Sequence, residues 1–207
     1  MPLQNLNSLA ANSTHSSPSV DGRVARGERT RDAIADALYA LIHDGVENPS
    51  GREIAERAEV SLRSVFQHFD DLEAVYTELI TRQESRIAPH LIAIDPELPL
   101  SERVDRIIEM RDSMFALAAP LRRSAGAHRA ARTSHTVKNG RLQLQRAQRE
   151  QLSRTFAVEI ADNDRLLLQV DIWLSFETWD QFLNQHGLSR AATRGHLQSL
   201  LMALLSR

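Results

Sequence analysis

Residues 61–68, SLRSVFQH, place hydrogen-bonding side chains on one short predicted helix. Arg63 and Gln67 stand four positions apart, so they lie on the same helical face. An arginine can donate two hydrogen bonds to a guanine edge, and a glutamine can pair similarly with adenine. Polar groups such as Ser61 and His68 can bind phosphate oxygens. The spacing therefore predicts contacts to double-stranded DNA. The alternative is an ordinary amphipathic helix whose polar side chains are only solvated.

Helix start signals surround this segment. Ser50 and Glu53 have the spacing of a capping box, in which each residue bonds the other's backbone amide. Ser61 is a second cap, for a helix that runs to about Phe69, and Asp70 or Asp71 can cap a third that runs to about residue 88. Two short helices joined by a tight turn, with a third directly after, form a helix-turn-helix, which sets one helix into the major groove.

Four segments of this region resemble the DNA-binding domain of the tetracycline-repressor (TetR) family: SGREIA at 50–55, AEVS at 58–61, FQHF at 66–69 and LEAV at 72–75. The resemblance is specific over residues 28–80. It implies an all-α protein of about nine helices, a homodimer on a near-palindromic operator and an effector site in the larger part. It also implies that Phe66 lies beside the DNA backbone.

Two positions depart from the family's pattern. Glu59 stands where the family usually has glycine in the turn, and a non-glycine residue with positive φ costs about 1 kcal/mol. Leu72 stands where the family tends to place a phosphate-binding lysine, so that contact is not expected here. The full predicted DNA-binding set is Arg29, Arg52, Ser61, Arg63, Ser64, Phe66, Gln67 and His68.

Composition favours packed helices. Of 207 residues, 42% are hydrophobic but only 5% aromatic, and cysteine is absent. A chain without thiols suits a reducing cytoplasm, and no apolar run is long enough to span a membrane. The polar N-terminus does not read as a signal peptide. We expect a disordered tail at 1–22, a DNA-binding domain at 23–88 and a ligand-binding and dimerisation domain at 89–207.

Charge is a weak point of the DNA-binding interpretation. The net charge is −2, and residues 22–90 hold nine arginines against thirteen acidic residues. Local patches rather than domain averages attract phosphates. Arg23, Arg26, Arg29 and Arg31 cluster at the start of the first predicted helix, residues 28–44. Modest non-specific binding is therefore expected.

The C-terminal part is expected to form five helices, over residues 101–119, 121–131, 136–160, 164–186 and 190–206. Apolar residues recur at intervals of three and four in the last two, which is typical of helices that bury a wide face. In the resembled family these two helices form a four-helix bundle with their copies. The predicted interface residues are Ile172, Trp179, Phe182, Leu197, Leu201 and Leu204; a purely intramolecular core is the alternative.

Methionine and aromatic side chains can line an adaptable apolar pocket. Met110, Met114, Phe115, Trp173 and Phe176 are the predicted lining for a small apolar or amphipathic effector, unless they are ordinary core. Residues 120–155 hold nine arginines and lysines against one acid, Glu150. That run could attract an anionic ligand or more nucleic acid, or form a solvated helix face.

No catalytic motif, metal-ligand spacing or cofactor fingerprint is present, so no enzyme activity, metal or cofactor is expected. The leading hypothesis is a homodimeric repressor that a small molecule releases from DNA. A second hypothesis uses the helix-turn-helix surface to bind a protein partner without sequence-specific DNA binding. A third, an all-helical enzyme, would need clustered titratable groups in the C-terminal part.

Overall fold

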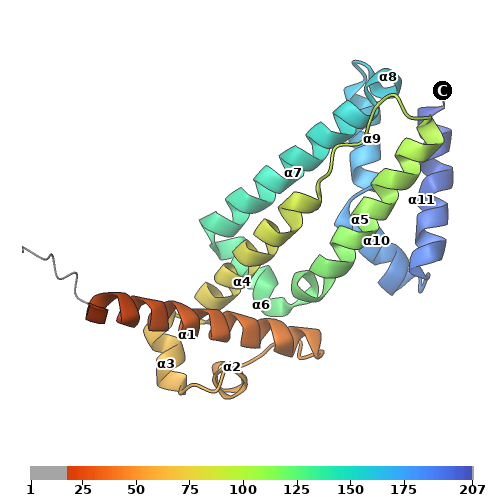
Figure 1. The fold of residues 1–207 in the computed structure, drawn as a ribbon. Coiled ribbons are helices and arrows are strands. Elements are labelled where there is room, and N and C mark those ends of the chain that lie inside the picture. Colours follow the sequence, from red (N-terminus) through yellow and green to blue (C-terminus); the bar gives the residue numbers. More distant parts are fainter. Residues whose placement is uncertain (1–17, 207) are drawn as a thin grey trace, which may run out of the picture.

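In the computed structural model, residues 18–206 are described, and every regular element within them is helical. The N-terminal part comprises α1 (Pro18–His43), α2 (Gly51–Arg57), α3 (Leu62–His68) and α4 (Leu72–Ile87), with a 3₁₀ turn, η1, at Ala88–His90. Figure 1 shows α2 and α3 beneath α1, at the end of the molecule farthest from α8. The all-α prediction is confirmed.

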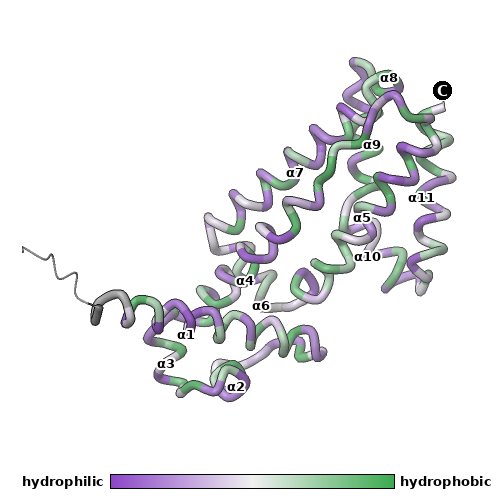
Figure 2. The backbone as a smooth tube through the Cα atoms, viewed as in Figure 1, coloured by the Kyte–Doolittle hydropathy of each residue, from purple (hydrophilic) through white to green (hydrophobic). Residues whose placement is uncertain are grey.

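The C-terminal part begins with α5 (Leu100–Arg123), α6 (Ala125–Thr133) and α7 (His135–Thr155). It continues with α8 (Ala157–Ile160), α9 (Asp164–Trp173), α10 (Phe176–Asp180), a π-helical turn η2 (Gln181–Gln185) and α11 (Arg190–Leu205). Along the long helices, hydrophobic and hydrophilic residues alternate (Figure 2), as expected of helices that bury one side. None of the helices within residues 18–206 is long and apolar enough to cross a membrane.

Helix boundaries differ from the sequence prediction in two places. The first helix begins at Pro18 rather than residue 28, so residues 18–22 of the expected tail are helical; residues 1–17 lie outside the described part. Pro120 does not end α5, which continues to Arg123 because Ala119 and Leu121 on either side are buried. A proline in the last turn removes only one backbone hydrogen bond.

Two of the nine expected helices are each divided, which gives eleven α-helices in residues 18–206. The helix expected at 164–186 breaks at Leu174–Ser175, where the Ser175 hydroxyl accepts a hydrogen bond from the Thr178 amide and starts α10. The helix expected at 136–160 breaks at Phe156, whose side chain is fully buried. A local cap thus interrupts the first of these helices, and burial of Phe156 accompanies the break in the second.

α4 joins the two parts of the molecule. It packs against α1 on one side and against α6 and α7 on the other. The core around Ile54, Val65 and Val75 therefore extends to Ala130 and Val137, past the boundary expected at residue 88. A second core, around Ile107, Leu152 and Leu201, fills the C-terminal part. Because α4 belongs to both halves, a shift of this helix would be transmitted between them.

Candidate nucleic-acid interface and effector cavity

The start of α2 is held by the predicted capping box. The Ser50 amide donates to Glu53 Oε2 at 2.8 Å, and the Glu53 amide donates to Ser50 Oγ at 3.3 Å. Hydrogen bonds from the Ser50 hydroxyl and amide hold the pKa of the Glu53 carboxyl below its ordinary value. At the start of α3, Ser61 Oγ accepts from the Ser64 amide at 3.0 Å. Local bonds thus fix both helix starts.

The turn between α2 and α3 has the strain expected from its sequence. Glu59 has a φ of 55°, in the left-handed region that favours glycine. Its amide donates to the Glu56 carbonyl at 3.1 Å, and the Val60 amide donates to the Ala55 carbonyl at 3.0 Å. The bonds that close the helix end are therefore kept despite the side chain.

Glu59→Gly is expected to raise the free energy of unfolding by up to about 1 kcal/mol, because glycine relieves the left-handed backbone. Glu56→Gly is the matched control. It is exposed inside α2 and should lower stability by about 1 kcal/mol. Urea denaturation of the three proteins measures both effects; a destabilised Glu59→Gly protein would contradict the strain.

The exposed face of α3 carries both polar and apolar side chains. Arg63 and Gln67 are exposed, and Ser64 is half-buried. Leu62 and Phe66 are apolar but 41% and 47% exposed, whereas Val65 and Phe69 of the same segment are buried. They lie beside Gly51 at the start of α2, where an added Cβ would come within 3.2 Å of Leu62 and 3.3 Å of Phe66. Gly51 therefore allows α2 and α3 to approach closely.

Arg31, which the sequence grouped with phosphate-binding arginines, instead positions α3. Its guanidinium lies 4.1 Å from the centre of the Phe69 ring. Nη1 donates to the His68 carbonyl at 2.7 Å, and Nη2 donates to Glu78 at 3.0 Å. One side chain of α1 thus ties the end of α3 to α4. His68 itself is half-buried, near Gly27 of α1, so it offers less surface to a phosphate than expected.

The acidic excess of this region is partly neutralised within it. Arg57 pairs with Asp44 at 2.9 Å, and Arg82 pairs with Asp32 at 2.7 Å. Arg29, Arg52 and Arg63 are exposed and make no ion pair among the described residues. These three predicted contact arginines are therefore available to a polyanion.

A cavity of about 1020 Å³ opens in the C-terminal part, between α4, α5, α6, α7, α9 and α10. Met114, Phe115 and Phe176 line it, as expected. Met110 and Trp173 do not: Met110 contacts Gln151, and Trp173 packs on the C-terminal core. Ile172, predicted at a dimer interface, lies in the cavity wall and is 54% exposed.

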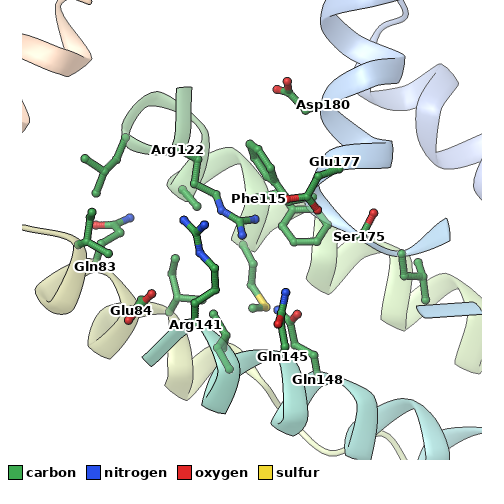
Figure 3. Close-up of a pocket in the computed structure, with 18 of the residues that line it drawn as sticks. Gln83, Glu84, Phe115, Arg122, Arg141, Gln145, Gln148, Ser175, Glu177 and Asp180 are labelled. Carbon is green, nitrogen blue, oxygen red and sulfur yellow. The ribbon is translucent and has the colours of Figure 1, made fainter. Parts of the chain in front are cut away.

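The cavity is far more polar than predicted (Figure 3). Glutamines and charged side chains surround the apolar patch, and six arginines of the basic stretch at 120–155 take part: Arg122, Arg123, Arg132, Arg141, Arg146 and Arg149. The sequence shows that this stretch is basic but not that it lines a cavity. Two features of the sequence mark this stretch: the arginines of α7 recur at about one helical turn, and Gly140 precedes them. In the structure, a Cβ at residue 140 would collide with the Glu84 carboxylate of α4.

Three predicted interface residues are corrected by their burial. Trp179, Leu197 and Leu201 are 3%, 4% and 0% exposed, so they fill the chain's own core. Trp179 donates from Nε1 to buried Asp112 at 2.8 Å, which fixes it inward. Phe182 and Leu204 are half-buried on η2 and α11 and keep some surface for a partner.

Solved structures share this architecture. A transcriptional regulator from Rhodococcus sp. Rha1 aligns with a TM-score of 0.61 at 17% identity, over 87% of this chain and 96% of its own. A TetR-family regulator from Streptomyces coelicolor aligns with a TM-score of 0.63 at 19% identity, over 87% and 80%. The chain has the TetR-regulator fold. The multidrug binding protein EbrR, complexed with imidazole, aligns with a TM-score of 0.55 at 17% identity, over 95% and 97%.

No protein-family model matches the sequence, and no curated protein does. The likeness thus resides in the TetR fold rather than in overall sequence. Leu72, one of the departures from the family pattern, is half-buried against the N-terminal core beneath Gly51. Its apolar side chain supports the contact between α2 and α3.

Proposed function

We propose that this protein is a DNA-binding transcriptional regulator, a homodimeric repressor that a small molecule releases from a near-palindromic operator. The observation that carries the proposal is the exposed Arg63–Gln67 face of α3, held in place by two caps and the Arg31 contacts. Arg63 and Gln67 would read bases, with Phe66 beside the sugar-phosphate backbone. Arg29, Arg52, Ser61, Ser64 and His68 would position phosphates. The proposed location of the protein is the cytoplasm, where it would bind DNA.

A homodimer is proposed because one short recognition helix reads only a few base pairs. A two-fold axis would place two such helices about 34 Å apart, in successive major grooves. Ile172, Phe182 and Leu204 remain the proposed interface residues, since their side chains keep exposed surface.

Effector control is proposed to act through α4. Ile80, Gln83, Glu84 and Ile87 of this helix line the cavity, and the same helix packs on α1 above the DNA-binding face. A ligand that prefers one position of α4 would shift the population toward one spacing of the two recognition helices. Its differential affinity for the two states sets the loss of DNA binding.

Fluorescence anisotropy with the promoter DNA beside the protein's own gene tests the proposal, with sedimentation of the complex giving the stoichiometry. We expect two chains per site and stronger binding to the promoter than to a random duplex. Because the DNA-binding part holds an acidic excess, the salt dependence should be shallow. A lack of binding at low salt would instead favour the protein-partner hypothesis.

A further inference from the structure

Two arginines from opposite walls meet in the cavity. Figure 3 shows the side chains of Arg122, from α5, and Arg141, from α7, extending toward one another across the space. Neither makes a hydrogen bond or ion pair within residues 18–206, whereas Arg123 pairs with Asp180 at 2.6 Å and Arg149 lies 4.0 Å from Asp171. Two like charges converge here without a carboxylate bonded between them.

The cavity as a whole is positively charged. Six arginines line it against four acids, Glu84, Asp171, Glu177 and Asp180, an excess of two positive charges. Behind the wall, Arg111 is 3% exposed and its Nε and Nη1 have no hydrogen-bond partner among the described residues. Burial lowers the pKa of Arg111 to about 10, so it stays cationic at neutral pH and adds to the positive potential.

An apolar surface adjoins the arginine pair. The Arg122 guanidinium lies 4.3 Å from the centre of the Phe176 ring, and Phe115 meets Phe176 edge to face at 5.7 Å. Met114 completes this wall. A flat apolar group could lie against these rings while an acidic group reaches both guanidinium groups, which suit a carboxylate's two oxygens.

We propose that the effector is an amphipathic organic anion, a carboxylate on an apolar ring body, held by Arg122 and Arg141 against Met114, Phe115 and Phe176. This inference rests on the proposed function for its regulatory meaning and narrows the effector to one charge class. It also explains the basic stretch at 120–155, since six of its nine cations line a cavity of about 1020 Å³, which is too small for duplex DNA. Glu84, which acts on both arginines, and Glu177, which acts on Arg122, are nearby carboxylates that oppose the ligand's charge.

Substitution of Glu84 should change the affinity for a carboxylate in the direction opposite to substitution of Arg122 or Arg141. The Glu84 carboxyl is half-buried near Arg122 and Arg141, and burial raises its pKa. Glu84→Gln removes the competing negative charge while keeping the side chain's size beside Gly140. A carboxylate ligand should therefore bind several-fold more tightly to this variant. Arg141→Gln should weaken the same ligand.

The experiment is calorimetric titration with 1-naphthoate, 1-naphthamide and 1-naphthylmethylamine, which differ in charge on one ring system; benzoate and 9-anthroate, with their amides, vary the size. We expect the best carboxylate to bind at least about tenfold more tightly than its amide. Arg122→Gln or Arg141→Gln should reduce that preference to below about threefold. Arg154→Gln is the matched control, because Arg154 lies on α7 but is exposed and outside the cavity.

Equal affinity for carboxylate and amide, tighter binding of the amine, or no carboxylate binding at millimolar concentration would overturn the proposal. If Arg122→Gln fails to fold, Arg141→Gln and Glu84→Gln still decide it. The titration uses no DNA. A protein that shows the charge preference but ignores its promoter would refute the proposed function alone, and a DNA-binding protein without the preference would refute this inference alone.

Discussion

Replacing Arg63 by alanine is expected to weaken operator binding by about 2–6 kcal/mol, or roughly thirtyfold and more. A bidentate arginine contact to guanine is worth about 1–3 kcal/mol of discrimination, and a dimer loses it in both half-sites. Gln67→Ala should act in the same direction, since Gln67 lies one turn away on the same exposed face. Binding to random duplex DNA should change far less, because that binding depends on phosphate contacts.

Arg86→Ala is the matched control for Arg63→Ala. Arg86 is exposed in the last turn of α4, so its loss removes the same charge from the same part of the chain, away from α3. Competition binding between operator and random DNA separates the two effects. If Arg63→Ala and Gln67→Ala both keep the preference of the unaltered protein, neither residue reads bases.

Local signals account for what could be predicted in the DNA-binding part. Ser50, Ser61 and Asp71 all cap helices in the structure. A cap depends on residues only three positions apart, so the sequence alone contains the whole interaction. The left-handed backbone at Glu59 was expected from the family resemblance, because the TetR family usually has glycine at this position of the turn.

The cavity could not be predicted in this way. Arg122 and Arg141 lie 19 positions apart and face each other only because α5 and α7 pack around α4. Helical periodicity shows that Met110 and Trp173 lie on apolar faces but not which neighbour those faces meet. The role of Arg31 was hidden similarly, since its partners Phe69 and Glu78 come from two later helices.

Asp112→Ala is expected to lower the free energy of unfolding by about 3 kcal/mol. Asp112 is 2% exposed in α5 and accepts hydrogen bonds from Trp179 Nε1 at 2.8 Å and from Arg190 Nη2 at 2.8 Å. Arg194 lies 3.5 Å away. Removing one partner of a buried charged network typically costs about 3–5 kcal/mol. The lower end applies here because Arg190 is half exposed and water can solvate it after the change.

Asp105→Ala is the matched control for Asp112→Ala. Asp105 also lies on α5 and also bonds α11, accepting from Gln198 at 2.6 Å, but it is exposed. Its loss should cost about 1 kcal/mol or less, because water replaces the bond. Urea denaturation compares the two, and equal destabilisation would show that the buried carboxylate does not hold α10 and α11 to α5.

Trp179 packs on Phe115 and Phe176 in the cavity wall. The less stable Asp112→Ala protein should therefore also bind cavity ligands more weakly than Asp105→Ala does.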